Sequence, residues 1–336
     1  MTSIQPSLQT LALALAGCAF ALPATAADWA PNRPVEFVVS AGPGGGTDQF
    51  ARVVQTIVQK YKLLPVPVVV SNKSGGAGTE AFVYAKSQKG DANKVVFSTN
   101  LAYLMPMITK VGYTIDDVTP LAVMAADEFV LWTHTDAPYK NAADLIADAR
   151  AKNGRFKMAG AQSKDTDHIL TRKIEQATGV KMTYVPFKSG GEVAVQLSGA
   201  HVDANTNNPS ESASHWRAGK VRPLCVFSAK RLDSKEKVTA EQGFGDLPTC
   251  KDAGIPVDAF HMPRTVWLAD DVKPEQVKFY ENLLDQVRQK PEWKAWLARG
   301  TQSDMFLVGG KLKDYVTADI KVHREQFGQD GWLVKD

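Results

Sequence analysis

The sequence predicts a two-lobed α/β protein in which each lobe is a mainly parallel sheet flanked by helices. Its 336 residues exceed the usual size of a single domain. Short β-branched runs alternate with stretches of helical period, which is typical of parallel sheets with helices on both faces. Because this alternation begins again near residue 130, we expect two hydrophobic cores.

The first series of elements begins at residue 34. The β-branched run 35–40 leads through a glycine turn into a segment whose apolar residues recur at helical spacing between 50 and 58. Further strands are expected at 66–70 and 95–98, with a helix at 79–86 between them.

The second series begins at residue 129. We expect strands at 129–133, 156–161, 182–186, 202–206 and 221–228, and helices at 145–152, 166–178, 191–197 and 209–217. After residue 256 we expect strands at 265–268 and 305–308, and helices at 274–289, 292–298 and 311–327. We assign residues 28–130 plus 256–336 to lobe 1 and 131–255 to lobe 2, so the chain crosses twice between them.

Residues 1–26 are typical of a secretory signal peptide. The first 27 residues carry no charged side chain, the apolar stretch 8–22 is too short to span a bilayer, and Ala-Thr-Ala at 24–26 suits cleavage. Leu-Ala-Gly-Cys at 15–18 also resembles a lipoprotein box, in which Cys18 would be lipidated. The mature protein is therefore expected to be exported, either soluble or held by lipid alone.

Charge and motif patterns exclude several classes of function. Lys plus Arg number 39 and Asp plus Glu 36, a net charge of +3, and the signs alternate without basic blocks, so we expect no nucleic-acid partner. The six histidines show no zinc-pair spacing and no nucleophile-elbow motif occurs. We therefore predict no metal and no cofactor. Ser163 with His168 is the only pair that suits a nucleophile and its base.

Two cysteines remain in the mature chain after cleavage, Cys225 and Cys250. In an exported protein they suit a disulfide that closes a loop of about 25 residues. Two buried free thiols are the alternative, because Cys225 lies in an apolar strand.

Three loops that join a predicted strand to a predicted helix suit an anion: 42–48, 159–168 and 187–192. Unpaired backbone N–H groups and the positive end of the helix dipole favour negative charge there. The glycines at 44–46 let a ligand approach the backbone closely. Each loop alone also fits a simple helix cap, but loops from two lobes would together form a cleft that holds an anion.

Several motifs carry, in their order and spacing, a resemblance to a known family. They are PVEFVV at 34–39, GGGTD at 44–48, VSNKSGGAG at 70–78, VPFKSGGE at 185–192, GAHVD at 199–203 and LPTCK at 247–251. Over essentially the whole mature chain the sequence resembles the extracytoplasmic solute receptors of tripartite tricarboxylate transporters, the Bug family. The resemblance implies a periplasmic binding protein of venus-flytrap architecture. Such a receptor closes over a small organic anion, here a di- or tricarboxylate, and delivers it to a membrane permease.

The resemblance also implies which residues bind the ligand. The backbone amides of Gly45, Gly46 and Thr47 would meet a carboxylate, and Asp48 would shape their turn. The other positions follow later strands of both lobes: Asn100, Ser163, Thr166, His168, Ser189, Gly190 and Asn207. Lys164 and Asp165 depart from the family's small residues, so Lys164 either contacts a second carboxylate or is held by Asp165.

Arg264 lies where the chain should re-enter lobe 1. Its guanidinium either forms a bidentate pair with a distal carboxylate of the ligand or belongs to a hinge and pairs with a nearby acid.

Two other functions use the same architecture. One is a hydrolytic enzyme that acts through Ser163 and His168. The other is a sensory receptor that signals to a membrane protein. The resemblance favours a monomeric periplasmic receptor whose partners are a small carboxylate and permease subunits.

Overall fold

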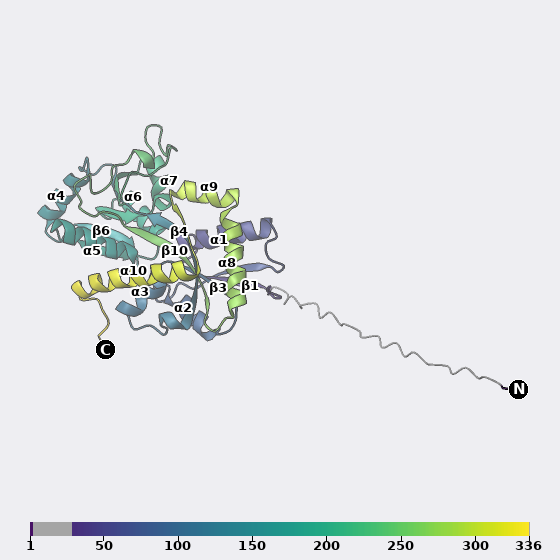
Figure 1. Ribbon diagram of the computed structural model, residues 1–336. Coiled ribbons are helices and arrows are strands. Elements are labelled where there is room, and N and C mark those ends of the chain that lie inside the picture. The colour runs from purple at the N-terminus through teal and green to yellow at the C-terminus, as the bar shows by residue number, and fades with distance from the viewer. Residues whose placement is uncertain (3–28, 336) are drawn as a thin grey trace.

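The computed structural model describes residues 1–2 and 29–335, which form two β-sheets covered by helices (Figure 1). Apart from residues 1 and 2, the predicted signal peptide lies outside the described residues, and so does Cys18. The predicted α/β fold class is confirmed. Within the described part of the chain, no helix has the length and apolar character needed to cross a membrane.

Sheet A and its helices form lobe 1. The strand order is β11-β4-β10-β3-β1-β2. The strands are β1 (Val35–Val39), β2 (Val68–Asn72), β3 (Lys94–Ser98), β4 (Val118–Glu128), β10 (His261–Ala269) and β11 (Ser303–Leu307). The helices are α1 (Gly46–Lys60), α2 (Thr79–Ser87), α3 (Leu101–Ile108), α8 (Pro274–Arg288), α9 (Pro291–Gly300) and α10 (Gly309–Gln329).

Sheet B and its helices form lobe 2. The strand order is β7-β6-β8-β5-β9. The strands are β5 (Val130–His134), β6 (Lys157–Ala161), β7 (Thr183–Phe187), β8 (Ala204–Asn207) and β9 (Val221–Val226). The helices are α4 (Ala142–Lys152), α5 (Thr166–Thr178), α6 (Gly190–Ser198) and α7 (Pro209–Arg217).

Both sheets are mixed, which refines the expectation of mainly parallel sheets. β1 runs parallel to β2 and β3, and β6 runs parallel to β7 and β8. The antiparallel pairs involve the strands that carry the chain out of one lobe and into the other. β4 leaves sheet A and β10 returns to it, so they run in opposite directions side by side, as do β5 and β9 in sheet B.

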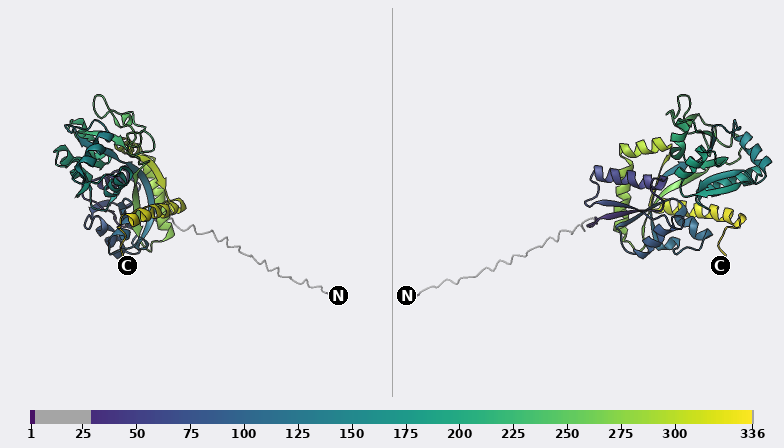
Figure 2. Two further views of the ribbon diagram at one scale, coloured as in Figure 1. Left: turned by 90° about the vertical axis from the view of Figure 1, so that its left-hand side faces the viewer. Right: turned by 180° about the vertical axis from the view of Figure 1, so that it is seen from behind.

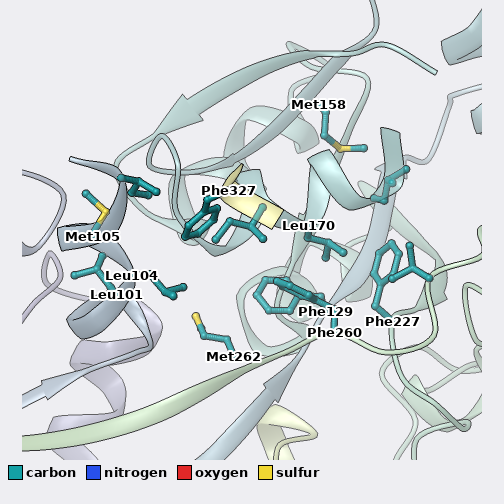
Figure 3. Packing of buried hydrophobic residues seen from close by; sticks show 14 of the residues in the cluster. Leu101, Leu104, Met105, Phe129, Met158, Leu170, Phe227, Phe260, Met262 and Phe327 are labelled. Atoms are coloured by element: carbon teal, nitrogen blue, oxygen red, sulfur yellow. The ribbon is translucent and has the colours of Figure 1, made fainter. Parts of the chain in front are cut away.

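One apolar core extends through both lobes. It includes Leu101 and Leu104 of α3, Leu170 of α5, and Phe129 and Phe260 between the sheets (Figure 3). A second core lies between sheet A and helices α1, α8 and α9, and a third joins sheet B to α6 and α7. The lobes therefore share buried apolar surface as well as covalent connections.

The chain passes between the sheets near Phe129 and again between Phe227 and Phe260. The Phe227 N–H donates to the Phe129 carbonyl at 2.8 Å, and the Phe260 N–H donates to the Phe227 carbonyl at 2.9 Å. The rings of Phe129 and Phe260 are 5.4 Å apart. These crossings support the predicted lobe limits, 28–130 plus 256–336 and 131–255, which stay a proposal.

The long helix α10 lies against both lobes (Figure 2). It packs on β4 and α3 of lobe 1, while the Gln326 side-chain amide donates to the Ile169 carbonyl of lobe 2 at 3.3 Å. Just after the helix, Asp330 forms an ion pair with Arg172 of α5 at 3.2 Å. The C-terminal segment is therefore a third contact between the lobes.

Cys225 and Cys250 form a disulfide, with their Cα atoms 4.8 Å apart. Both residues are fully buried. The alternative of two free thiols is therefore wrong, and the bond ties β9 to the segment that returns toward lobe 1.

Candidate functional site

A cavity of about 80 Å³ lies between the lobes where three helices begin. Seven of the residues predicted to bind the ligand line it: Gly45, Gly46, Thr47, Thr166, Ser189, Gly190 and Arg264. They come from the starts of α1, α5 and α6 and from strand β10. The N-terminal ends of helices carry partial positive charge and unpaired N–H groups, so three of them around one cavity suit an anion.

The turn before α1 is braced by Asp48. Its carboxylate accepts from the Gly44 N–H at 2.9 Å, from the Asn72 amide at 2.9 Å and from Arg52 at 2.8 Å. Burial alone would raise the pKa of Asp48, but Arg52 and the Gly44 N–H outweigh it and hold the pKa below its usual range. Asp48 therefore shapes the turn, as expected, and does not line the cavity.

Glycine is required at Gly46 by the approach of Arg264. A Cβ on Gly46 would collide with the Nη2 atom of Arg264. A Cβ on Gly45 would meet only ordinary contacts, the nearest being the Gly42 carbonyl at 3.5 Å and the Ser189 Cβ at 3.9 Å. Ser189 belongs to lobe 2, so the turn before α1 and the turn before α6 face each other at this point.

Arg264 lines the cavity and is also paired with an acid. The side chain is 3% exposed, its Nη1 donates to the Thr47 hydroxyl at 2.9 Å, and its Nη2 pairs with Asp127 at the end of β4. The other Asp127 oxygen accepts from Gln302. Of the two alternatives drawn from the sequence, the structure shows the pairing with a nearby acid, Asp127, while contact with a ligand carboxylate stays a prediction.

Three further carboxyl groups line the same cavity: Asp165, Asp167 and Glu211. Asp165 is the N-cap of α5 and accepts from the Thr166 N–H at 2.8 Å, while Asp167 accepts from the Ala161 N–H at 2.6 Å. Burial raises the pKa of Asp165, and it raises the pKa of Asp167 well above the usual range.

Glu211 has a pKa raised to about 7, mainly by burial. The charge of Arg264 opposes this rise and the charge of Asp127 adds to it. The carboxyl packs against the start of α6, because a Cβ on Gly190 would overlap it.

Four other predicted residues lie away from the cavity lining. Asn100 is 1% exposed and accepts from the Thr166 hydroxyl at 3.4 Å, which links the lobes. Asn207 is buried, and its side-chain amide donates to the carbonyl of Gly190, the first residue of α6, at 2.8 Å. Asn207 therefore helps to hold the start of α6 in place. Ser163 is exposed on the loop before α5.

The fourth, His168, is a packing residue. Its ring stacks on Tyr184 with centroids 3.9 Å apart and also contacts Trp332, and its Nδ1 accepts from the Lys164 N–H at 3.1 Å. Burial lowers the pKa of His168 to about 4. This nitrogen is therefore not free to act as a base for Ser163. The Lys164 ammonium reaches the Ile108 carbonyl at 3.5 Å.

Sequence reasoning missed Glu211, Asp127 and Asp167 as members of this cluster. Glu211 had a usable motif, because Asn208-Pro209 followed by a glutamate at the third helical position is typical of a helix start. Asp127 had none, because it lies 137 residues from Arg264 in sequence.

Two α/β lobes that enclose a polar cavity between them are the architecture expected of a two-lobed solute-binding receptor. The family described as "Tripartite tricarboxylate transporter family receptor" matches residues 50–298 of this chain. A protein of Cupriavidus necator, the UPF0065 protein in the gbd 5′ region, is 30% identical over 314 residues, which are 93% of this chain and 91% of that protein. The chain belongs to the tripartite tricarboxylate transporter receptor family, and it is a solute-binding receptor rather than an enzyme.

Solved structures share the fold. The periplasmic binding protein BugD superimposes with a TM-score of 0.79 at 21% identity, over 91% of this chain and all of BugD. Rpa4515 of R. palustris, solved with adipate, gives a TM-score of 0.80 at 24% identity, over 90% of this chain and 99% of its own.

Proposed function

We propose that this receptor captures a small organic anion, a di- or tricarboxylate, between its lobes and delivers it to the permease of a tripartite tricarboxylate transporter. The observation that carries the proposal is the meeting of three helix N-termini at one cavity between the lobes. The adipate in Rpa4515, a protein of the same fold, supports a dicarboxylate. The signal-like residues 1–26 support a place in the periplasm.

Within the proposed site, we assign the anion to the backbone N–H groups at the start of α1, with Gly46 and Thr47 facing the ligand. Ser189 and Gly190 would close on it from lobe 2. The Ser189 hydroxyl already caps α6 by accepting from the Glu192 N–H at 3.3 Å, so its backbone rather than its side chain is suited to the ligand.

A thermal-shift screen tests the ligand class. A ligand that binds only the folded state raises the unfolding free energy by RT ln(1 + [L]/Kd), about 2.7 kcal/mol at a hundredfold excess over Kd. We expect at least one acid in a panel of di- and tricarboxylates to raise the melting temperature. Stabilisation by uncharged solutes or amines alone would contradict the proposal.

Uptake by a deletion strain tests delivery to a permease. We expect loss of uptake of the acid that the screen identifies, restored by the wild-type gene. Normal uptake together with a lost transcriptional or chemotactic response would instead identify a sensory receptor.

A further inference from the structure

Glu211 lies in the cavity between the two lobes. It is the third residue of α7, it lines this cavity together with Gly46 of lobe 1, and its carboxyl packs against Gly190 at the start of α6 in lobe 2. Its contact with Gly190 leaves no room for a side chain there. A protein carboxyl group thus already stands where the proposed function places the carboxylate of the ligand.

The charged side chains around the Glu211 carboxyl do not supply an unpaired positive charge for a ligand anion. Glu211 faces Arg264 on β10, Asp127 on β4 and Asp167 on α5. Arg264 is already paired with Asp127, and Asp165 lines the same cavity. Asp165, Asp167 and Glu211 line a cavity of about 80 Å³, so the carboxylate of a ligand would be the fourth carboxyl group at this cavity. Like charges this close cannot all stay ionised.

Among these groups, Glu211 is the one placed to take up a proton near neutral pH. Burial raises its pKa to about 7, and its carboxyl packs against Gly190 at the start of α6, where the proposed function places the ligand. Burial also raises the pKa values of Asp165 and Asp167. A nearby ligand carboxylate raises the pKa of Glu211 further, because it disfavours the ionised form. Lys188, also in the lining, is exposed to solvent on the rim and is therefore a weak counter-charge.

We propose that a carboxylate ligand binds together with one proton, which Glu211 takes from solvent and shares with the ligand in a hydrogen bond. The inference rests on the proposed function, because it concerns the same cavity. Glu211 is therefore a specificity-determining residue. It selects an acid whose carboxylate can accept a hydrogen bond from the protonated Glu211 side chain.

Titration calorimetry with adipate and with malate, between pH 7 and 9, tests the proposal. In the wild type we expect Kd to rise about tenfold per pH unit once Glu211 is ionised. Buffers of different ionisation enthalpy should give about one proton taken up per ligand at pH 8. In Glu211→Gln the neutral amide still donates, so Kd should stay nearly constant and proton uptake should vanish.

Glu128→Gln is the matched control. Burial also raises the pKa of Glu128 to about 7, but this carboxyl accepts from Ser303 and does not line the cavity. The control should keep the pH dependence of the wild type. An unchanged slope in Glu211→Gln, or wild-type binding without proton uptake, overturns the inference.

The outcomes separate this inference from the function on which it rests. If the acids bind without proton uptake, the inference alone fails. If no di- or tricarboxylate binds at any pH, the proposed function fails and the inference with it. The number of protons that the wild-type protein takes up per bound ligand tests the inference even if Glu211→Gln does not fold.

Discussion

At the scale of single residues, the site depends on Gly46, where the start of α1 meets the Arg264 guanidinium. Asp127 and Thr47 hold that guanidinium in place, so it cannot move aside freely. The missing side chain of Gly46 therefore keeps both the helix amides and the arginine at the cavity wall.

Gly46→Ala should weaken binding of the acid found in the screen by about tenfold or more, roughly 1.4 kcal/mol. The added methyl group collides with Arg264 and displaces either the loop or the guanidinium. Gly45→Ala is the control, because its methyl group meets only ordinary contacts, and its Kd should change less than about twofold. Calorimetry that finds equal losses for the two variants would contradict this account of the loop.

Residue roles were predictable from the sequence only where they depend on local structure. Asp48 and the α1 glycines lie in one turn, so their type and spacing were informative. The pairing of Arg264 with Asp127 depends on the register of β10 against β4, which places Arg264 opposite Ala125. The packing of the His168 ring was not predictable, because its neighbours Tyr184 and Trp332 come from distant parts of the chain.

At the scale of elements, helices with clear start motifs were predicted best. The ranges 166–178 and 209–217 are those of α5 and α7, whose starts carry Asp165 and Asn208-Pro209. β4 was missed because its sequence, VTPLAVMAADE, has few β-branched residues and contains Pro120. It forms a strand because β10 and β11 pair with it on both sides. α3 was missed because it is short and contains Pro106.

The disulfide is the element-scale feature with the clearest effect on stability. Cys225→Ala with Cys250→Ala should lower the unfolding free energy by roughly 3 kcal/mol, because a loop of 25 residues is no longer closed in the unfolded chain. Urea unfolding of the oxidised wild type and of the double variant measures the difference. A loss below about 1 kcal/mol would show that the bond adds little to the fold.

At the scale of the whole molecule, the proposed function requires the lobes to move. The cavity of about 80 Å³ is smaller than the several hundred Å³ usual for small-molecule sites. We therefore expect the lobes to open to admit the proposed acid and to close again around it, about the crossings at Phe129, Phe227 and Phe260. Helix α10 and the Asp330–Arg172 ion pair lie against both lobes, so we expect them to adjust during this motion.

The division into two lobes was accessible from the sequence because the strand–helix alternation restarts near residue 130. The mixed character of the sheets was not, because the pairing of β4 with β10 joins segments on either side of lobe 2. The same limit applies to the cavity, whose lining combines residues of α1 and β10 in lobe 1 with residues of α5, α6 and α7 in lobe 2.

A crystal structure with the acid identified by the screen tests the central claim most directly. We expect one carboxylate of the ligand within hydrogen-bond distance of the backbone N–H of Gly46 or Thr47, with Ser189 or Gly190 on the same ligand from lobe 2. Ligand density instead in the separate hollow of about 450 Å³ beside Glu128 and residues 230–236, with the space between α1 and α6 empty, would contradict the account.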